Sequence, residues 1–244
     1  MRERIKWLLF PGINLHTRQR YRILPRCLES AAPGGACLLD AGCGNGMLSY
    51  RACLKGYQVT GISFKEGEVA RCRKLFNGYL GIPEERLQFK VMNLYDVEAL
   101  NQQYDQIICT EVLEHLMRDD AVCRSLFSLL KPNGVIHICC PNADHPYNRS
   151  FPLDPGENGG HVRAGYTYES YRRLLEPIGF RIVGQRGLGG PVRQFFNSRI
   201  KRLQEKYGDV VAFPLFLLSF LFLWLDREEA RVPYTLYVKA VKPA

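Results

Sequence analysis

A glycine-rich stretch near the start of the chain has the residue types and spacing that could hold a nucleotide-like ligand. The stretch reads Leu38-Leu39-Asp40-Ala41-Gly42-Cys43-Gly44-Asn45-Gly46. An apolar run ends on a carboxylate, three glycines follow at alternate positions, and a helical pattern begins at Met47. A turn of this kind between a strand and a helix presents backbone N–H groups to a ligand above the carboxyl edge of an α/β sheet. The sequence therefore predicts that this turn binds a nucleotide-like cofactor.

The details of the stretch distinguish between cofactors. A dinucleotide fingerprint needs Gly-x-Gly-x-x-Gly with an acid about twenty residues later, but here Met47 stands at the sixth position and Asp40 precedes the first glycine. The stretch resembles the first motif of class I S-adenosylmethionine-dependent methyltransferases, apolar-apolar-Asp-x-Gly-x-Gly-x-Gly. The resemblance implies that the turn holds the methionine end of S-adenosylmethionine, with Asp40 near its amino group. The residues of the turn are Gly42, Cys43, Gly44, Asn45 and Gly46. The alternative is a structural turn in another α/β protein.

Two further positions match cofactor-binding positions of that family. The second strand of the family usually ends on an acid that holds the ribose hydroxyls, and Ser63-Phe64 stands there instead, so a neutral hydroxyl replaces a charge. After the third strand, Asn93-Leu94 matches an Asp-apolar pair that reads the adenine amino group and the neighbouring ring. An asparagine carbonyl can accept the same hydrogen bond. Taken alone, each position would fit a simple turn former.

A second stretch carries carboxylates and an imidazole close together. Cys109-Thr110-Glu111-Val112-Leu113-Glu114-His115-Leu116 resembles the motif after the fourth strand of the family, with Thr110 and Glu111 beside the cofactor. Its Glu-x-x-Glu-His form is similar to ubiquinone-biosynthesis O-methyltransferases and to small-RNA 3′-terminal 2′-O-methyltransferases. In both groups these residues are associated with a divalent metal, and a later histidine joins them. The resemblance implies a metal set of Glu111, Glu114, His115 and His161.

The spacing makes this metal set physically feasible. Glu111 would end a strand, and Glu114 and His115 would lie in the first turn of a helix, so all three can face one point. His161 lies in the long loop after the fifth strand, which hangs over the same edge in this fold. Two carboxylates and two imidazoles suit Mn²⁺, Fe²⁺ or Zn²⁺, and also Mg²⁺ if water fills some positions. The alternative is a helix start that favours glutamate, with a histidine that only lines the pocket.

Three histidines are candidates for the catalytic base. Methyl transfer to a hydroxyl requires alignment of the acceptor and removal of its proton. Imidazole titrates near neutral pH, which points to His115, His145 and His161. A metal-bound hydroxyl would serve the same end, because the metal lowers its pKa. A single histidine is more often structural, so the assignment depends on their clustering at one edge.

The elements that position these residues alternate between strand and helix. Strands are predicted at residues 37–40, 59–62, 87–92, 106–110, 135–140, 180–187 and 234–241. Helical spacing is found at residues 47–55, 65–76, 113–130 and 168–175. The pattern predicts an α/β fold with a doubly wound, mostly parallel seven-stranded sheet, the Rossmann-like fold of the methyltransferases. We expect a basic amphipathic helical segment over 1–35, a core over 36–187, a helical insertion over 188–232 and the final strand within 233–244.

Composition limits the partners and the compartment. The chain has 244 residues, a net charge of +9 and nine cysteines. Residues 1–26 carry a local charge of +6 and residues 191–206 one of +4, so the rest is nearly neutral. Such segments suit an anionic membrane or a phosphate-bearing substrate better than a nucleic-acid groove, although two solvated helix faces would look the same. Without Cys-x-x-Cys or an export signal, we expect a cytoplasmic protein, with peripheral attachment to the inner face of a membrane as a further option.

Residues 191–226 combine a basic amphipathic stretch with an apolar one. Residues 210–225 are almost entirely apolar, but this run is shorter than the about 20 residues that a bilayer span needs. The combination suits a peripheral membrane contact or a lid over an apolar substrate. Burial against the same domain or a dimer partner is the alternative, and the oligomeric state is left open.

The sequence as a whole predicts an S-adenosylmethionine-dependent methyltransferase. The resemblance favours O-methylation of a small or lipid-linked hydroxyl compound, with S-adenosyl-L-methionine as cofactor and a divalent metal (Mg, Mn, Fe or Zn) as an option. One alternative is methylation of an RNA 3′ end or a sugar, in which the basic segments would bind phosphates. Another is a non-catalytic module of the same fold that binds a membrane or a partner.

Overall fold

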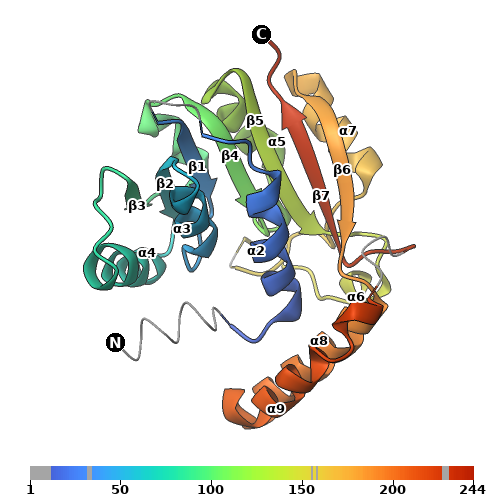
Figure 1. Cartoon of the computed structure of the whole chain (residues 1–244). Helices are drawn as coiled ribbons and strands as arrows, with labels where there is room; N and C mark the ends of the chain where they lie inside the picture. Colours follow the sequence, from blue (N-terminus) through green and yellow to red (C-terminus); the bar gives the residue numbers. More distant parts are fainter. Residues whose placement is uncertain (1–11, 32–34, 155, 158, 227–230) are drawn as a thin grey trace.

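The sheet is the centre of the fold (Figure 1). A computed structural model describes residues 12–31, 35–154, 156–157, 159–226 and 231–244. The strands are β1 (Cys37–Ala41), β2 (Gln58–Ser63), β3 (Leu87–Val91), β4 (Tyr104–Thr110), β5 (Leu130–Pro141), β6 (Arg181–Leu188) and β7 (Thr235–Val241). Their order is β3-β2-β1-β4-β5-β7-β6, and all are parallel except β7, which runs antiparallel to β5 and β6. The predicted fold class, a mostly parallel seven-stranded α/β sheet, is confirmed.

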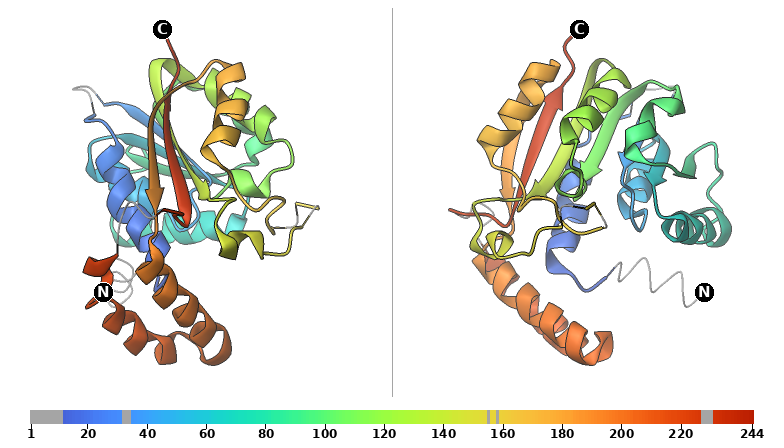
Figure 2. Two further views of the ribbon diagram at one scale, coloured as in Figure 1. Left: turned by 90° about the vertical axis from the view of Figure 1, so that its right-hand side faces the viewer. Right: turned by 180° about the vertical axis from the view of Figure 1, so that it is seen from behind.

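Helices cover both faces of the sheet (Figure 2). One face packs against α2 (Leu15–Cys27), α3 (Met47–Leu54) and α4 (Glu66–Cys72). The other packs against α5 (Asp119–Ser128) and α7 (Tyr168–Leu175). The short helical segments are η1 (Arg73–Tyr79), η2 (Leu94–Leu100), η3 (Leu113–His115), α6 (Pro146–Arg149), η4 (Glu176–Ile178) and η5 (Leu223–Leu225). Helices α8 (Pro191–Tyr207) and α9 (Asp209–Ser219) form a hairpin outside the sheet.

Strand β1 shows why an unbroken apolar run becomes a central strand. Leu38 packs into the core on the α2 side and Leu39 into the core on the α5 side, and both are fully buried. Successive side chains of a strand point to opposite faces, so a strand covered on both faces is apolar along most of its length, and in β1 Asp40 near the carboxyl end is the exception. The burial on both sides fixes β1 in the middle of the sheet, and its carboxyl end leads into the glycine turn.

The helix predicted at residues 113–130 is wrong in its first part and in its last residues. The chain makes the short turn η3, then an irregular stretch, and α5 begins only at Asp119. The reason is a competing partner: the Arg163 guanidinium donates to the carbonyl oxygens of Leu116 (2.7 Å) and Met117 (3.2 Å). Helix α5 ends at Ser128, and Leu130 already belongs to β5. The helix predicted at 65–76 instead changes at Arg73 into a π-helix that ends at Tyr79.

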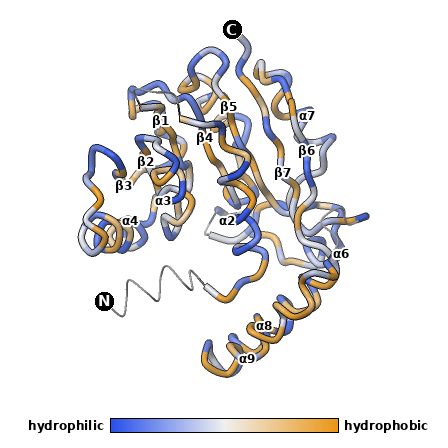
Figure 3. Tube along the Cα trace, viewed as in Figure 1, coloured by the Kyte–Doolittle hydropathy of each residue, from blue (hydrophilic) through white to orange (hydrophobic). Residues whose placement is uncertain are grey.

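The insertion predicted before the last strand consists of α8, α9 and η5. A buried cluster joins the hairpin to the start of α2 through Leu15, Phe196, Ile200, Ala212 and Phe216. In Figure 3 the hairpin carries a large share of the hydrophobic colour outside the sheet. Within the described ranges, no helix is both long and apolar enough to cross a membrane. Of the predicted N-terminal segment, helix α2 is described, whereas residues 1–11 lie outside the described residues.

Candidate active site

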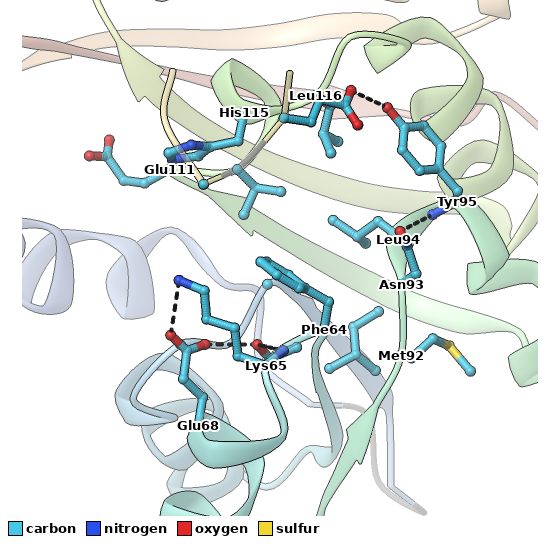
Figure 4. Close-up of a pocket in the computed structure, with 17 residues that line it drawn as sticks. Phe64, Lys65, Glu68, Met92, Asn93, Leu94, Tyr95, Glu111, His115 and Leu116 are labelled. Carbon is cyan, nitrogen blue, oxygen red and sulfur yellow. Dashed lines mark hydrogen bonds and ion pairs between the residues drawn. The ribbon is translucent and has the colours of Figure 1, made fainter. Parts of the chain in front are cut away.

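A pocket of about 270 Å³ opens at the carboxyl end of the parallel strands (Figure 4). It lies between the ends of β1, β2, β3 and β4, and part of the loop after β5 also lines it. Several residues predicted from the sequence line it: Gly42, Gly44, Ser63, Phe64, Asn93, Leu94, Glu111 and His115. The motifs after four separate strands therefore converge on one cavity, as the geometry of an open α/β sheet requires.

The glycine turn presents open backbone to this pocket at one position. Gly44 has φ of +52°, and a Cβ built there would meet nothing within 4 Å. The flanking glycines serve packing instead, because a Cβ at Gly42 would lie 2.3 Å from Val112 and one at Gly46 would lie 2.7 Å from Phe76. The turn thus fits tightly against the protein at both ends and leaves room for a ligand in the middle.

Asp40 and Asn45 lie beneath and beside the turn. Asp40 is buried and accepts a hydrogen bond from Ser49 Oγ at 2.5 Å, and burial raises its pKa to about 6. The Asn45 side chain accepts from the backbone N–H of Met47 (3.1 Å) and from the hydroxyl of Tyr21 on α2 (2.8 Å). Asn45 therefore fixes the start of α3 and ties α2 to the turn.

A carboxylate reaches the pocket where the sequence has only Ser63. Ser63 Oγ donates to Glu68 Oε2 at 2.7 Å, and Glu68 also lies 3.7 Å from Lys65 Nζ. Glu68 comes from the first turns of α4 and lines the pocket (Figure 4). Glu68 was not among the predicted site residues, because the family motif points only to the position at the strand end. The available signal was an acid five residues later, at the start of a helix that follows the strand.

The start of η2 and the residues before it form another side of the pocket. Leu94 is buried and lines the cavity together with Met92, whereas the Asn93 side chain accepts from the Tyr95 N–H at 3.1 Å and caps η2. Asn93 therefore has the capping role of a turn former in addition to its place at the pocket. Phe64 follows β2, is 64% exposed and also lines the pocket, where its ring could cover a bound ligand.

Glu111 connects the pocket to α2. It has φ of +55°, which is uncommon for a residue with a side chain. Its Oε2 lies 3.4 Å from Nη2 of Arg20, a buried residue on α2 that the sequence analysis did not single out. Burial raises the pKa of Glu111, and the positive charge of Arg20 opposes this shift. The other carboxylate oxygen, Oε1, has no hydrogen-bond partner within the described part of the chain.

Three of the four predicted metal ligands meet beside the pocket. One potential ligand atom from each of Glu114, His115 and His161 lies within 4.8 Å of the other two. Both oxygens of Glu114 are buried and lack a hydrogen-bond partner among the described residues, and burial together with the Glu111 charge raises the pKa of Glu114 to about 8. Glu111 is not in this group, since it faces Arg20. A buried carboxyl beside two imidazoles is the donor set of a transition-metal or proton-transfer site.

Hydrogen bonds orient the two imidazoles of this cluster. His115 Nδ1 lies 2.8 Å from the carbonyl oxygen of Gly160, and a carbonyl only accepts, so Nδ1 carries a proton and Nε2 is the nitrogen left to bind a metal or another proton. The rings of His115 and His161 meet edge to face at 4.7 Å between centroids. Burial lowers the pKa of His161, with smaller contributions from the charges of His115 and Lys201. The burial and the neighbouring positive charges all favour the neutral form of the His161 imidazole.

His145, Cys43 and Thr110 lie outside the pocket lining. His145 caps α6 by accepting the N–H of Tyr147 at 3.3 Å, and its ring packs edge to face on Tyr234 at 5.4 Å. His145 is thus separate from the three-residue cluster. The predicted clustering of three histidines is correct for His115 and His161 only.

The loop that carries His161 is held in place by Arg163. Besides the two carbonyls after η3, its guanidinium pairs with Asp119 at the start of α5 and donates to the Tyr166 hydroxyl at 3.0 Å. The N–H of Val162 donates to the Glu114 carbonyl at 2.8 Å. These bonds bring His161 to the cluster from a position 46 residues along the chain from His115.

Comparison with known proteins decides the family. A family model described as a methyltransferase domain matches residues 15–185, well over half of the chain. The chain belongs to the class I S-adenosylmethionine-dependent methyltransferases. Every element that lines the pocket lies within the matched residues. The family predicted from the glycine turn and the Glu-x-x-Glu-His stretch is confirmed.

The relatives of this methyltransferase include enzymes of quinone synthesis. The ubiquinone biosynthesis O-methyltransferase of Pseudomonas putida (strain GB-1) is 34% identical over 114 residues, which make up 47% of this chain and 48% of that protein. That of Xanthomonas axonopodis pv. citri (strain 306) is 34% identical over 113 residues, 45% of each chain. The chain thus spans about half the length of the curated relatives it matches.

Solved structures confirm the fold of this methyltransferase. The magnesium protoporphyrin IX methyltransferase of Synechocystis PCC 6803 with bound S-adenosylmethionine has a TM-score of 0.57 at 18% identity, over 93% of this chain and 80% of that one. The [4+2]-cyclase SpnF has a TM-score of 0.64 at 20% identity, over 92% and 81%. A cyclase among the neighbours illustrates that the fold alone does not determine the reaction.

The pocket of this methyltransferase fits S-adenosylmethionine, the cofactor of its family. Gly44 leaves open space where a side chain would project, which suits a ligand against the backbone. The Glu68 carboxylate supplies an acceptor for hydroxyl groups, and Leu94 with Met92 supplies an apolar wall for a base. The fit rests on these residues rather than on the acid that the family usually has at the position of Ser63.

Proposed function

We propose that this methyltransferase methylates the oxygen of a small or lipid-linked hydroxyl compound. The observation that carries the proposal is the Glu114–His115–His161 cluster, because His115 belongs both to the cluster and to the pocket lining. An acceptor next to the cofactor would therefore lie within reach of groups that take up a proton. The similarity to ubiquinone biosynthesis O-methyltransferases, which covers about half of each chain, supports the same acceptor chemistry.

In this proposal the chain's residues position two reactants and remove one proton. S-adenosylmethionine supplies an electrophilic methyl group on a positively charged sulfur. The turn at Gly44 holds the amino-acid end, and Glu68 accepts hydrogen bonds from the ribose hydroxyls. His115 keeps the lone pair of Nε2 available because Nδ1 donates to Gly160, so it can accept the acceptor's proton. Val112 and Leu116, which line the pocket beside His115, keep water from the reacting atoms.

A divalent cation is the second part of the proposal. The buried Glu114 oxygens without partners and the two neighbouring imidazoles fit such an ion, with Glu114, His115 and His161 as ligands. A bound ion would take up the Nε2 lone pair of His115, so the ion and the His115 base are alternatives. With the ion bound, the hydroxyl that coordinates to it would have a lowered pKa and would lose its proton without His115. Glu111 remains a predicted fourth ligand, but it would have to exchange its ion pair with Arg20 for the metal.

A methylation assay with several acceptor classes tests the acceptor. The purified chain is incubated with S-adenosylmethionine labelled in the methyl group and, separately, with catechols and other small phenols, prenylated phenols in detergent, simple sugars, and RNA with free 3′ ends. Label is expected in the phenols and prenylated phenols, and His115→Ala should reduce the rate strongly. His145→Ala is the matched control because it alters a histidine outside the cluster. Labelling confined to RNA or sugars would overturn the proposed acceptor.

Metal content tests the cation directly. The chain and its His161→Ala and His145→Ala variants are dialysed against Mn²⁺, Fe²⁺, Zn²⁺ or Mg²⁺, and bound metal is measured by elemental analysis. One equivalent is expected in the parent chain and in His145→Ala, and much less in His161→Ala. Equal metal content in all three would contradict the assignment of His161 as a ligand, whatever the activity.

A further inference from the structure

One side of the α9–η5 segment is apolar and open to solvent. We define the apolar face by Val210, Leu217, Leu218, Leu221, Trp224 and Leu225. These side chains are between 47% and 86% exposed, with Trp224 at 78% and Leu221 at 68%. Large apolar side chains gathered on one segment of a soluble fold indicate a contact surface rather than chance exposure.

The apolar face is not needed for the packing of the hairpin. The opposite side of α9 already buries Ala212 and Phe216 against Phe196 and Ile200 of α8 and against Leu15 of α2. One stripe of residues on the segment is thus buried in the core of the hairpin, and a second stripe is exposed to solvent. Of the options predicted from the sequence, burial against its own domain accounts for the first stripe only.

A cationic cavity of about 520 Å³ lies next to the apolar face. Arg18, Arg22 and Arg51 from α2 and α3 line it, and Phe220 and Trp224 form the side toward the hairpin. Asp226 is the acid among its lining residues, and it lies 3.1 Å from Arg193 and also accepts from backbone N–H groups of α8. Among the described lining residues, positive side chains therefore outnumber negative ones.

One arginine of the cavity, Arg18, lies over aromatic rings of the hairpin. The Arg18 guanidinium lies 5.3 Å from the ring centroid of Phe216 and 5.7 Å from that of Phe220. Arg18 and Arg51 both line the cavity, and burial together with the positive charge of Arg51 lowers the pKa of Arg18. Positive groups concentrated beside an apolar surface attract a partner that has anionic groups next to hydrocarbon.

We propose that the apolar face and the cationic cavity dock the protein on an anionic lipid bilayer. Apolar side chains would enter the boundary between headgroups and acyl chains, Trp224 would lie at the headgroup level, and the cavity would take a lipid phosphate. Helix α9 has 11 residues, so it would lie in the interface and not cross it. The charge complementarity favours this partner over a second copy of the chain, whose corresponding surface would be equally positive.

The hairpin lies at the same edge of the sheet as the cofactor pocket, so docking on a bilayer would affect which substrate reaches the pocket. β6 is parallel to β1 and β4, so it ends at the same edge of the sheet as they do, and α8 begins three residues after β6. Figures 1 and 2 show α8 and α9 beyond this edge, at the end of the molecule where the cofactor pocket opens. Docking would place the pocket near the membrane surface. This consequence, which selects the lipid-linked acceptor, rests on the proposed function; the docking itself does not.

Tryptophan fluorescence provides a test that is independent of activity. The chain has two tryptophans, so Trp7→Phe leaves Trp224 as the reporter. Vesicles of phosphatidylcholine with phosphatidylglycerol should shift its emission to shorter wavelength, and lipids brominated on the acyl chains should quench it. Vesicles of phosphatidylcholine alone should do neither. An unchanged spectrum with anionic vesicles, together with no co-sedimentation of the parent chain, would overturn the proposal.

Variants separate the two parts of the surface. Leu221→Ser with Trp224→Ser, and separately Arg22→Gln with Arg51→Gln, should each weaken co-sedimentation with anionic vesicles roughly tenfold or more. Val183→Ser changes an exposed apolar residue on β6 and should leave binding unchanged. Calorimetry with S-adenosylmethionine checks that each variant is folded. If the parent chain does not bind S-adenosylmethionine, that result counts against the proposed function and not against the docking. If the Leu221/Trp224 variant binds vesicles normally, or if it only converts a dimer into a monomer, the bilayer proposal is wrong.

Discussion

At the scale of single residues, the carboxylate of the pocket comes from Glu68 on α4 and not from the end of strand β2. Ser63 stands where the family usually has an acid, and Glu68 reaches the same place from α4 with Ser63 as its hydrogen-bond donor. The hydroxyl thus orients the carboxylate instead of replacing it. The pocket therefore has a carboxylate beside Ser63, although the strand end does not carry it.

Glu68→Gln should therefore weaken the binding of S-adenosylmethionine. A hydrogen bond to a charged group contributes about 1.5–3 kcal/mol, so calorimetry should show roughly a ten- to hundredfold increase in Kd. The control is Glu66→Gln, which removes an exposed acid from the same helix outside the pocket lining. Equal affinities for both variants would show that Glu68 does not contact the cofactor.

Gly44→Val should abolish cofactor binding without unfolding the chain. The new side chain would occupy the open space beside the turn, where the ligand is expected. The left-handed conformation costs a residue with a side chain about 1–2 kcal/mol, so stability should fall modestly. Gly81→Val is the matched control, because Gly81 also has a positive φ (+68°) with no atom within 4 Å of a built Cβ but lies outside the pocket lining. Retained affinity in Gly44→Val would refute the role of the turn.

At the scale of elements, the sequence predicts the strands, the turns and the type of sheet, because these follow from the local pattern of apolar residues and glycines. The strand and glycine turn at β1, the sheet class and the convergence of Asn93, Glu111 and His115 all follow from apolar runs and from the common edge of parallel strands. The break between η3 and α5 does not follow, because Arg163, far along the chain, takes the carbonyls that a helix would use. Glu68 and the capping role of His145 were missed for a similar reason: each depends on a contact rather than on spacing.

Arg163→Met tests whether that contact holds the loop after β5. The variant loses an ion pair with Asp119 and the donors to Leu116 and Met117, so the free energy of unfolding should fall by about 2 kcal/mol. Because the loop carries His161, methylation and metal binding should fall as well. Arg149→Met, which breaks an exposed pair with Asp144 in the same loop, should change stability by less than about 0.5 kcal/mol. Similar urea midpoints for the two variants would contradict this account.

At the scale of the whole molecule, buried histidines should make the fold sensitive to acid. His137 lies in β5, fully buried, with its ring nitrogens 2.8 Å from the Tyr237 hydroxyl and from the Gln106 amide oxygen. Burial lowers its pKa to about 3, so between pH 6.5 and 3 the unfolded chain binds a proton that the folded chain does not. This part of the stability is fully present above the ordinary pKa of 6.5 and is lost as the pH falls.

The contribution of His137 is best isolated by a double difference. Denaturation of the parent chain and of His137→Gln at pH 7 and pH 5 gives the change in unfolding free energy for each. Lowering the pH should cost the parent chain about 2 kcal/mol more than it costs the variant, because only the parent chain has this buried imidazole. The raised pKa values of Asp40 and Glu114 act in the opposite sense in both proteins and cancel in the comparison. A difference close to zero would mean that His137 is protonated in the folded state.

The whole molecule presents its pocket, its histidine cluster and its exposed hairpin at one end of the sheet. This common orientation relates the proposed chemistry to the proposed membrane contact, since an acceptor held in a bilayer would approach from the hairpin side. Both proposals presuppose that the cofactor occupies the pocket above the carboxyl end of β1.

A crystal structure of the chain with S-adenosylhomocysteine tests this most directly. The account predicts density for the ligand across the turn at Gly44, with its ribose hydroxyls on the Glu68 carboxylate and its base between Phe64 and Leu94. The homocysteine sulfur should face the side of the pocket lined by His115. Crystals grown at saturating ligand with this pocket empty, or with the ligand bound elsewhere on the chain, would contradict the account.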